Sequence, residues 1–379
     1  MMSRPCGRAP ESGGEIAEPS ARMPKHLVTP TTDHPGTHTI GFLLVPEFSM
    51  IAFTSSLEPL RLANRVSGQN LFAWRIYSQD GSPVTASNGV RLEVNGSFGE
   101  VGPMPEIIVC AGVDVQKHDH SALIARLRRL SFYGVSIGAV CTGTYILAKA
   151  GLLDGYRCTI HWENYNAFRE EFPDIEVTQE LFEMDRNRFT CAGGTAAIDM
   201  MLSLISEKKG SEIAALVTDE LIHHRMREAN ERQRMELRAR LGVANTKILT
   251  VAELMERHLE EPLSCSALAK RAGLSPRQLE RLFRKYVGET PTRYYLGLRL
   301  DRARQLLLQT SMPILAVGLA CGFVSASHFS SSYSQYFGRT PSEERQGFRK
   351  RRSKSVPPPN GGALDLHDEA GSEPVQARH

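Results

Sequence analysis

One cysteine and one histidine have the residue types and spacing needed for covalent chemistry. Cys141 lies in the sequence GAVCTG (138–143), where small residues follow an apolar run and precede a helical pattern. Such a strand–turn–helix junction is the layout of a nucleophile elbow, which projects one side chain above a sheet. A thiol beside a helix N-terminus is expected to have a lowered pKa, and His161, 20 residues later, is a candidate general base. A cysteine-dependent hydrolase or amidase is therefore one candidate function.

Arginines near the C-terminus indicate a different chemistry. Between Asn245 and Arg352, 18 lysines and arginines stand against nine acidic residues, whereas the formal net charge of the whole chain is only +3. Such a local excess can neutralise nucleic-acid phosphates, and arginine and glutamine can read guanine and adenine in the major groove. The predicted DNA-binding residues are Arg277, Gln278, Glu280, Arg281 and Arg284, and a second, neutral set of Ser325, Ala326, Ser327, His328, Ser330 and Ser331. Any single arginine of the first set could instead face only phosphate or solvent.

An internal repeat must position these two sets. The sequences AGLS (272–275) and CGFV (321–324) are each followed by a helical stretch that ends in Gly-x-Thr-Pro, at 288–291 and 338–341. Each copy has the helix, glycine turn, helix order of a helix-turn-helix unit, and the glycine permits the positive φ of a sharp turn. We therefore predict an all-α DNA-binding domain over 246–350 whose two units meet successive major-groove faces. The residues expected to pack the two pairs are Leu268, Leu274, Leu279 and Leu282, and Val317, Phe323, Phe329 and Tyr333.

Alternating strand-like and helix-like patterns precede this domain. Apolar runs at 40–45, 107–112 and 135–140 are typical of buried strands, and helical patterns follow them. The alternation predicts a doubly wound, flavodoxin-like α/β domain over 37–210, followed by a charged helical linker over 211–245. Ligands of such sheets bind at the carboxyl ends of the strands. The predicted ligand-binding residues are Glu47, Phe48, Gly112, Cys141, Thr142, His161, Trp162, Gly194 and Thr195.

Both regions resemble known families. The paired helices with their Gly-x-Thr-Pro motifs resemble the AraC/XylS DNA-binding domain. Residues 39–209, with the elbow and the sequence CAGGTAAID (191–199), resemble PfpI-type proteins of the class I glutamine amidotransferase-like superfamily. The fusion resembles the GlxA branch of transcriptional regulators. This resemblance implies a transcriptional regulator, an activator rather than a repressor, that is controlled by a small metabolite such as a quaternary amine or an amino acid.

The resemblance also implies a pocket without catalysis. Catalytic PfpI-type relatives carry an acidic residue where Ile51 stands here, and an isoleucine cannot accept a proton or orient a histidine. Nothing in the sequence places Glu47 or Glu58 at the elbow instead. We therefore expect no enzyme activity, although a cysteine-dependent hydrolase or amidase with an accessory DNA-binding module is the alternative. Trp162 could bind a quaternary ammonium group through a cation–π contact, or could simply pack in the core.

Composition restricts the location and the partners. The seven cysteines contain no CxxC pair, which argues against a disulfide framework or a zinc module, so we expect no metal and no cofactor. We see no secretory signal and no apolar run near the roughly 20 residues that span a bilayer, so we expect a cytoplasmic protein without a membrane partner. Segments 1–36 and 351–379 have the composition of a disordered leader and tail. The expected partners are double-stranded promoter DNA, a small-molecule effector, RNA polymerase and a second copy in a homodimer; a basic helical bundle that binds protein is the alternative.

Overall fold

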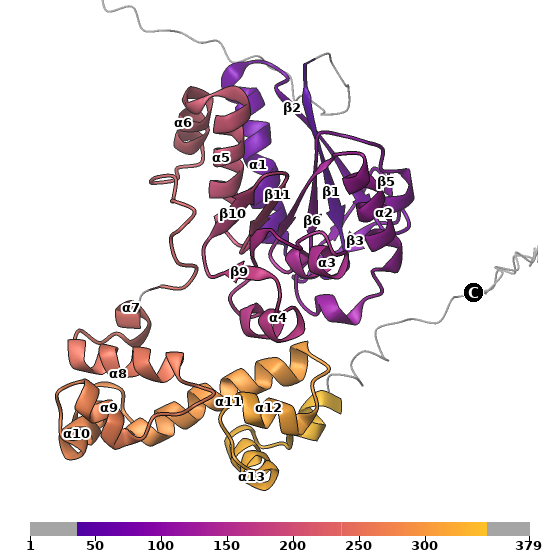
Figure 1. Cartoon of the computed structure of the whole chain (residues 1–379). Coiled ribbons are helices and arrows are strands. Elements are labelled where there is room, and N and C mark those ends of the chain that lie inside the picture. Colours follow the sequence, from indigo (N-terminus) through magenta and orange to yellow (C-terminus); the bar gives the residue numbers. More distant parts are fainter. Residues whose placement is uncertain (1–35, 236, 347–379) are drawn as a thin grey trace, which may run out of the picture.

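The computed structural model describes residues 36–235 and 237–346, which form an α/β domain followed by an all-helical domain (Figure 1). The predicted leader over 1–36, except for Gly36, and the predicted tail over 351–379 lie outside the described residues. No helix within the described ranges is both long and apolar enough to cross a bilayer.

A seven-stranded sheet forms the centre of the α/β domain, with the strand order β10-β11-β7-β6-β1-β2-β5. All neighbours pair in parallel except β10 and β11. Because β1 lies between β2 and β6, the direction of sheet growth reverses there, and the carboxyl ends of β1 and β6 are the switch point at which such sheets bind ligands. The predicted doubly wound, flavodoxin-like class is confirmed. The strands of the sheet are β1 (His38–Leu44), β2 (Phe72–Ser78), β5 (Gly96–Ser97), β6 (Glu106–Cys110), β7 (Ser136–Val140), β10 (Phe182–Asp185) and β11 (Arg188–Cys191).

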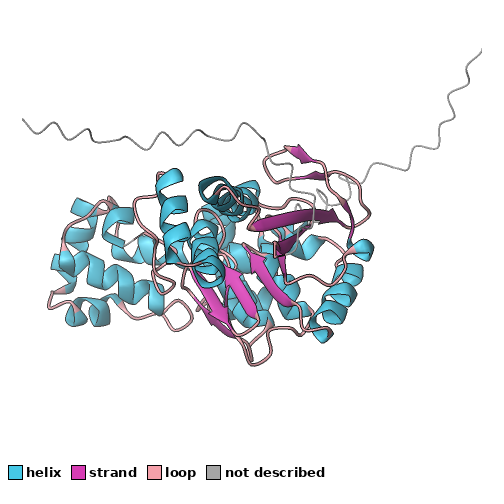
Figure 2. Cartoon of the chain, turned by 90° about the horizontal axis from the view of Figure 1, so that it is seen from above, coloured by secondary structure: helices cyan, strands magenta, loops and turns pink. Residues whose placement is uncertain are grey.

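Helices cover both faces of this sheet (Figure 2). One apolar core lies between the sheet and α1, α5 and α6, and a second lies between the sheet and α2, α3 and α4. The bounds of these helices are α1 (Met50–Ser67), α2 (Ser121–Phe132), α3 (Gly143–Lys149), α4 (Tyr165–Glu171), α5 (Ala196–Lys209) and α6 (Ser211–Glu220). Short elements complete the domain: β3 (Val84–Thr85) with β4 (Arg91–Leu92), β8 (Arg157–Thr159) with β9 (Glu176–Thr178), and the 3-10 turns Phe98–Glu100 and Val115–Lys117.

The predicted helical linker is wrong over most of its length. Helix α6 belongs to the core of the α/β domain, since Ala214 and Val217 are buried in the apolar cluster that α1 and α5 also form. Residues 221–235 are not helical, and the next helix is α7 (Leu237–Leu241). The intervening segment instead pairs its backbone with the sheet domain: the Leu181 N–H donates to carbonyl groups of the segment, and residues 180 and 232 form an antiparallel bridge. Tertiary pairing has here overridden the helical preference of a charged sequence.

The C-terminal domain consists of one helix, α8, followed by two helix pairs that one long helix joins. Its helices are α8 (Thr246–Arg257), α9 (Cys265–Arg271), α10 (Pro276–Tyr286), α11 (Pro291–Gln309), α12 (Ile314–Ala320) and α13 (Ala326–Phe337). The eight residues predicted to pack these pairs are buried, apart from the half-buried Leu274 and Leu282. Gly273 and Gly322 have φ of 62° and 75°, as the turns require. The Gly-x-Thr-Pro motifs are helix starts, because the hydroxyls of Thr290 and Thr340 accept backbone N–H groups three residues on.

Candidate ligand-binding and DNA-binding sites

Cys141 has the backbone of a nucleophile elbow. It directly follows β7 and has a left-handed φ of 59°, which non-glycine residues rarely adopt. Gly193, after β11, makes room for it: a Cβ on Gly193 would lie 2.7 Å from the Cβ of Cys141. The predicted turn is therefore present, and it depends on a second turn from a distant part of the chain.

The loops after four strands meet around this elbow. The hydroxyl of Thr142 donates to the carbonyl of Gly112 at 2.6 Å, and Gly112 pairs with Phe48 in an antiparallel bridge. Gly112 cannot carry a side chain, because a Cβ would lie 2.3 Å from the carbonyl oxygen of Glu47. The structure thus brings together Phe48, Gly112, Cys141 and Thr142, with Gly194 and Thr195 following in the turn against Cys141.

The Cys141 thiol is protonated, contrary to the expected lowering of its pKa. Burial raises its pKa to about 12; the Thr142 backbone N–H acts in the opposite direction, and the Glu163 carboxylate raises it further. Burial also lowers the pKa of His161, partly offset by Glu163, whose carboxylate lies 3.8 Å away. A buried thiol loses more from lost hydration than it gains from one backbone dipole.

Neither predicted substitute carboxylate reaches the elbow. Glu47 lies 3.5 Å from His118, and Glu58 pairs with Arg61 at 2.6 Å. Within the described part of the chain, Cys141 makes no side-chain hydrogen bond to a carboxylate or to a histidine. The arrangement therefore has the shape of a catalytic elbow without a base to activate it.

Trp162 faces away from this elbow toward the second domain. Its ring is half-buried, and the guanidinium of Arg234 lies 4.6 Å from the ring centroid. With Glu163 it lines a cavity of about 1540 Å³ between the two domains, whose walls come from α4, the segment 228–235, α8 and α11. Cys141, Thr142 and Thr195 do not line this cavity. The predicted set of ligand-binding residues thus falls into two places.

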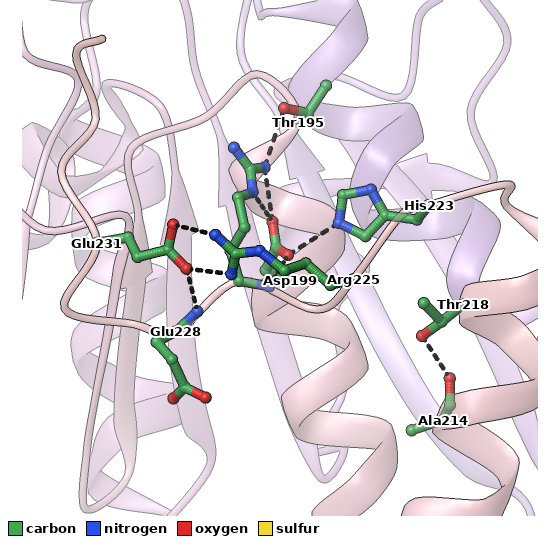
Figure 3. Close-up of polar contacts among 9 residues, drawn as sticks. Thr195, Asp199, Ala214, Thr218, His223, Arg225, Glu228 and Glu231 are labelled. Atoms are coloured by element: carbon green, nitrogen blue, oxygen red, sulfur yellow. Dashed lines mark hydrogen bonds and ion pairs between the residues drawn. The ribbon is translucent and has the colours of Figure 1, made fainter. Parts of the chain in front are cut away.

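Residues 221–235, called here the strap, are fastened to the α/β domain by a buried carboxylate that the sequence predictions missed (Figure 3). Asp199 in α5 is fully buried and accepts hydrogen bonds from the backbone and the guanidinium of Arg227 at 2.6–2.9 Å. His223 lies 3.0 Å from the same carboxylate, and Arg227 also donates to the hydroxyl of Thr195 at 3.0 Å. His223 is therefore a second partner of the Asp199 carboxylate. The Asp199 clasp is defined as Asp199, Arg227, His223 and Thr195.

The rest of the strap continues from the clasp to the DNA-binding domain. The Gln233 amide donates to the hydroxyl of Thr159 and to the carbonyls of Ile160 and Glu180, each at 2.9 Å. Just beyond the strap, the Nη2 atom of Arg240 donates to both carboxylate oxygens of Glu256 in α8, each at 3.0 Å. The strap therefore contacts the turn at Thr195, the step before His161 and, through α7, the first helix pair.

The second helix of the first pair, α10, presents the predicted residues to solvent. All five are exposed, but they are not equally available. Gln278 closes a capping box with Ser275, and Arg284 pairs with Glu280 at 2.8 Å. Arg277 and Arg281 have no such partner within the described residues, which leaves both guanidinium groups free to reach a duplex.

Helix α13 presents a smaller, neutral face. Ser325 caps it by accepting the His328 N–H, and the His328 ring packs on Phe323 at 5.6 Å. Ala326, Ser327 and Ser331 are exposed with Ser325 and His328, whereas Ser330 is only partly exposed. Direct base reading by this face would depend on hydroxyl and methyl contacts.

Comparison with known proteins agrees with both domains. Residues 39–207 match the DJ-1/PfpI family, and residues 268–347 match a helix-turn-helix domain family. The HTH-type transcriptional regulator GbdR of Pseudomonas aeruginosa is 46% identical over 82% of this chain and 84% of its own length. The HTH-type transcriptional regulator GlxA of Rhizobium meliloti is 37% identical over 86% of this chain and 99% of its own.

A likeness to an enzyme covers less than half of the chain. The isonitrile hydratase of Pseudomonas putida is 33% identical over 47% of this chain and 75% of its own length. The likeness to GbdR and GlxA, in contrast, extends through both domains. The chain belongs to the AraC-type transcriptional regulators that carry an N-terminal DJ-1/PfpI domain.

Proposed function

We propose that this DNA-binding regulator responds to a small metabolite that binds in its α/β domain without being converted. The observation that carries the proposal is the state of Cys141: the elbow backbone is retained, but burial raises the pKa of the thiol to about 12 and no described base contacts it. A protonated thiol without a neighbouring base is a poor nucleophile. The switch point of the sheet can still bind a ligand, because ligand binding there does not require a reactive thiol.

The proposed receptor is the crevice lined by the turns after β1, β6, β7 and β11. The ligand-binding residues proposed there are Glu47, Phe48, Gly112, Cys141, Thr142, His161, Gly194 and Thr195. Contact between Thr195 and Arg227 supports a path from this crevice to the strap. A quaternary amine or an amino acid remains the proposed effector class.

On the DNA side, we infer that α10 reads bases and α13 contributes weaker contacts. The exposure and freedom of Arg277 and Arg281 support their role as base readers, and arginine forks suit guanine. Three further residues are proposed to orient the helix and to contact phosphates or neighbouring bases: Gln278, Glu280 and Arg284. Their present contacts, the capping box of Gln278 and the Glu280–Arg284 pair, would have to break first. Ser325, Ala326, Ser327, His328, Ser330 and Ser331 are proposed for the second groove face.

The wider assembly is proposed on family likeness. A homodimer would supply two half-sites, RNA polymerase would be the partner of an activator bound at a promoter, and the protein would act in the cytoplasm. No metal or cofactor is needed for this role.

A metabolite screen on the full chain tests the proposal. Amino acids and methylated amines are added to the wild-type chain and to Cys141→Ala, and thermal stability and metabolite consumption are both measured. We expect a metabolite to raise the melting temperature of both proteins by mass action, without being consumed. Consumption that the wild type shows and Cys141→Ala lacks would instead establish a cysteine-dependent enzyme, such as the hydrolase or amidase considered above. The likeness to an isonitrile hydratase favours an enzyme but not that reaction class.

A further inference from the structure

A cation supplied by the chain itself already covers the Trp162 ring. The guanidinium carbon of Arg234 lies 4.6 Å from the ring centroid, a distance at which a cation is attracted by the negative face of an indole. Glu163 and Glu256 interact electrostatically with this guanidinium, one from each domain. Arg234 remains accessible to solvent, although partial burial in the cavity lowers the pKa of its guanidinium.

The surroundings of Trp162 favour positive ligands. The interdomain cavity that Trp162 and Glu163 line has eight acidic side chains and six arginines in its walls. Four of those arginines are already paired or stacked within the protein. Arg302 lies 3.5 Å from Glu170 and Arg304 lies 3.4 Å from Glu344, while Arg234 covers the ring of Trp162 and Arg169 that of Tyr165. An aromatic face beside a carboxylate is the arrangement that binds guanidinium and alkylated ammonium groups.

We propose that Trp162 and Glu163 form an organic-cation site at the domain interface, and that Arg234 is its built-in occupant, displaced when a guanidinium or alkylated ammonium metabolite binds. The inference rests on the proposed control by a small molecule and adds to the crevice at Cys141 a second site, at the domain interface, through which that control can act. Arg234 lies next to Gln233, which holds the strap on Thr159, and shortly before Arg240, which holds Glu256 of α8. Displacing Arg234 therefore loosens the strap between its two anchor points and alters how the domains are held together.

The test measures the fluorescence of Trp162 after the second tryptophan, Trp74, has been replaced. The chain has two tryptophans, so in a Trp74→Phe full-length background the emission reports on Trp162 alone. Methylguanidinium and tetramethylammonium chloride are titrated separately, with sodium chloride for ionic strength and methylurea as the uncharged counterpart of methylguanidinium. The variants are Arg234→Ala, Arg234→Lys and Glu163→Gln. Arg232→Ala is the matched control, because Arg232 is an arginine of the same strap and lines the same cavity.

We expect Arg234→Ala to bind at least one of the two cations more tightly than the parent protein does. A tethered competitor reduces the apparent affinity to the fraction of sites that are open, so the gain is about tenfold if Arg234 fills the site in roughly nine molecules of ten. Arg234→Lys should fall between them, Arg232→Ala should match the parent, and Glu163→Gln should weaken binding. Methylurea should not bind. Equal affinities in Arg234→Ala and the parent, or no saturable response in Arg234→Ala to either cation, would overturn the inference. These titrations contain no DNA, so a failure of the cation site would not contradict the proposed regulator function. Conversely, a failure to bind DNA would not contradict the cation site.

Discussion

At the scale of the residue, Cys141 combines the backbone of a catalytic turn with a thiol that burial keeps protonated. The left-handed φ is maintained by a glycine opposite, Gly193, where any side chain would collide with Cys141. The sequence GAVCTG was enough to predict this turn. It could not predict the pKa, because the atoms that bury the thiol come from the turns after other strands.

Alkylation tests the state of this thiol. With a pKa of about 12, roughly one Cys141 in ten thousand is a thiolate at pH 8, and that fraction rises about tenfold per pH unit below the pKa. We expect iodoacetamide to leave Cys141 unlabelled in the native protein at pH 8 while labelling Cys265, which is partly exposed, as peptide mass spectrometry would show. Complete labelling of Cys141 at neutral pH would contradict the assignment, and unfolded protein provides the positive control.

At the scale of the element, the strap shows how far local sequence can mislead. Its charged residues have helical preferences, and no proline or glycine interrupts them between Leu221 and Leu241. The structure instead uses their charges for contacts at long range, with Asp199 as the buried anchor of Arg227. No sequence window around either residue contains this pair, since 28 positions separate them. The helix pairs, in contrast, were predictable because their turns, caps and apolar positions repeat locally.

Removing Arg227 should destabilise the α/β domain. Arg227→Ala leaves the fully buried Asp199 carboxylate without its main partner, and breaking a buried ion pair costs about 3–5 kcal/mol. Urea unfolding measures the change. Arg225→Ala is the matched control, because Arg225 pairs with Glu231 at the surface and should change stability little. Equal effects of the two substitutions would show that the Asp199 clasp does not anchor the strap.

Helix α10 gives the second prediction at this scale. Arg277→Ala and Arg281→Ala should each cost about 1–3 kcal/mol of binding to a specific duplex and relax its sequence preference at one position. Arg284→Ala should cost less and act on all sequences alike, since Arg284 is paired with Glu280. Fluorescence anisotropy on a duplex selected by the full chain from random sequences measures all three. Unchanged affinity in Arg277→Ala and Arg281→Ala would remove these residues as base readers.

At the scale of the whole molecule, the two domains touch through α4 and α11 as well as through the strap (Figure 1). Ala167 of α4 is buried in the same apolar cluster as Leu300 and Ala303 of α11, and Arg302 of α11 lies 3.5 Å from Glu170 of α4. Helix α11 joins the two helix pairs, so a shift of α4 bears directly on their relative placement. Family likeness predicted both domains, but this contact depends on side chains from two separate folds and had no sequence signal.

Placing a charge at this contact should uncouple the domains. Ala167→Glu buries a carboxylate among apolar side chains, which is costly without a partner. We expect calorimetry of the full chain to show two more widely separated unfolding transitions than in the wild type. Arg169→Ala is the control: Arg169 is exposed on the same helix and lines the interdomain cavity, but its guanidinium covers Tyr165 of α4 itself, so the thermogram should be unchanged. An unaltered profile for Ala167→Glu would mean that the α4–α11 contact does not couple the domains.

Sequence-specific binding of a duplex by the full chain is the most direct test of regulator function. A duplex selected from random sequences and its scrambled counterpart are compared by anisotropy at physiological salt, with the Arg277→Ala, Arg281→Ala double variant alongside. Specific sites typically bind at least about a thousandfold more tightly than non-specific ones, so the wild type should show such a ratio and the double variant should lose most of it. Equal affinity of the wild type for both duplexes would contradict a sequence-specific role for the paired helices.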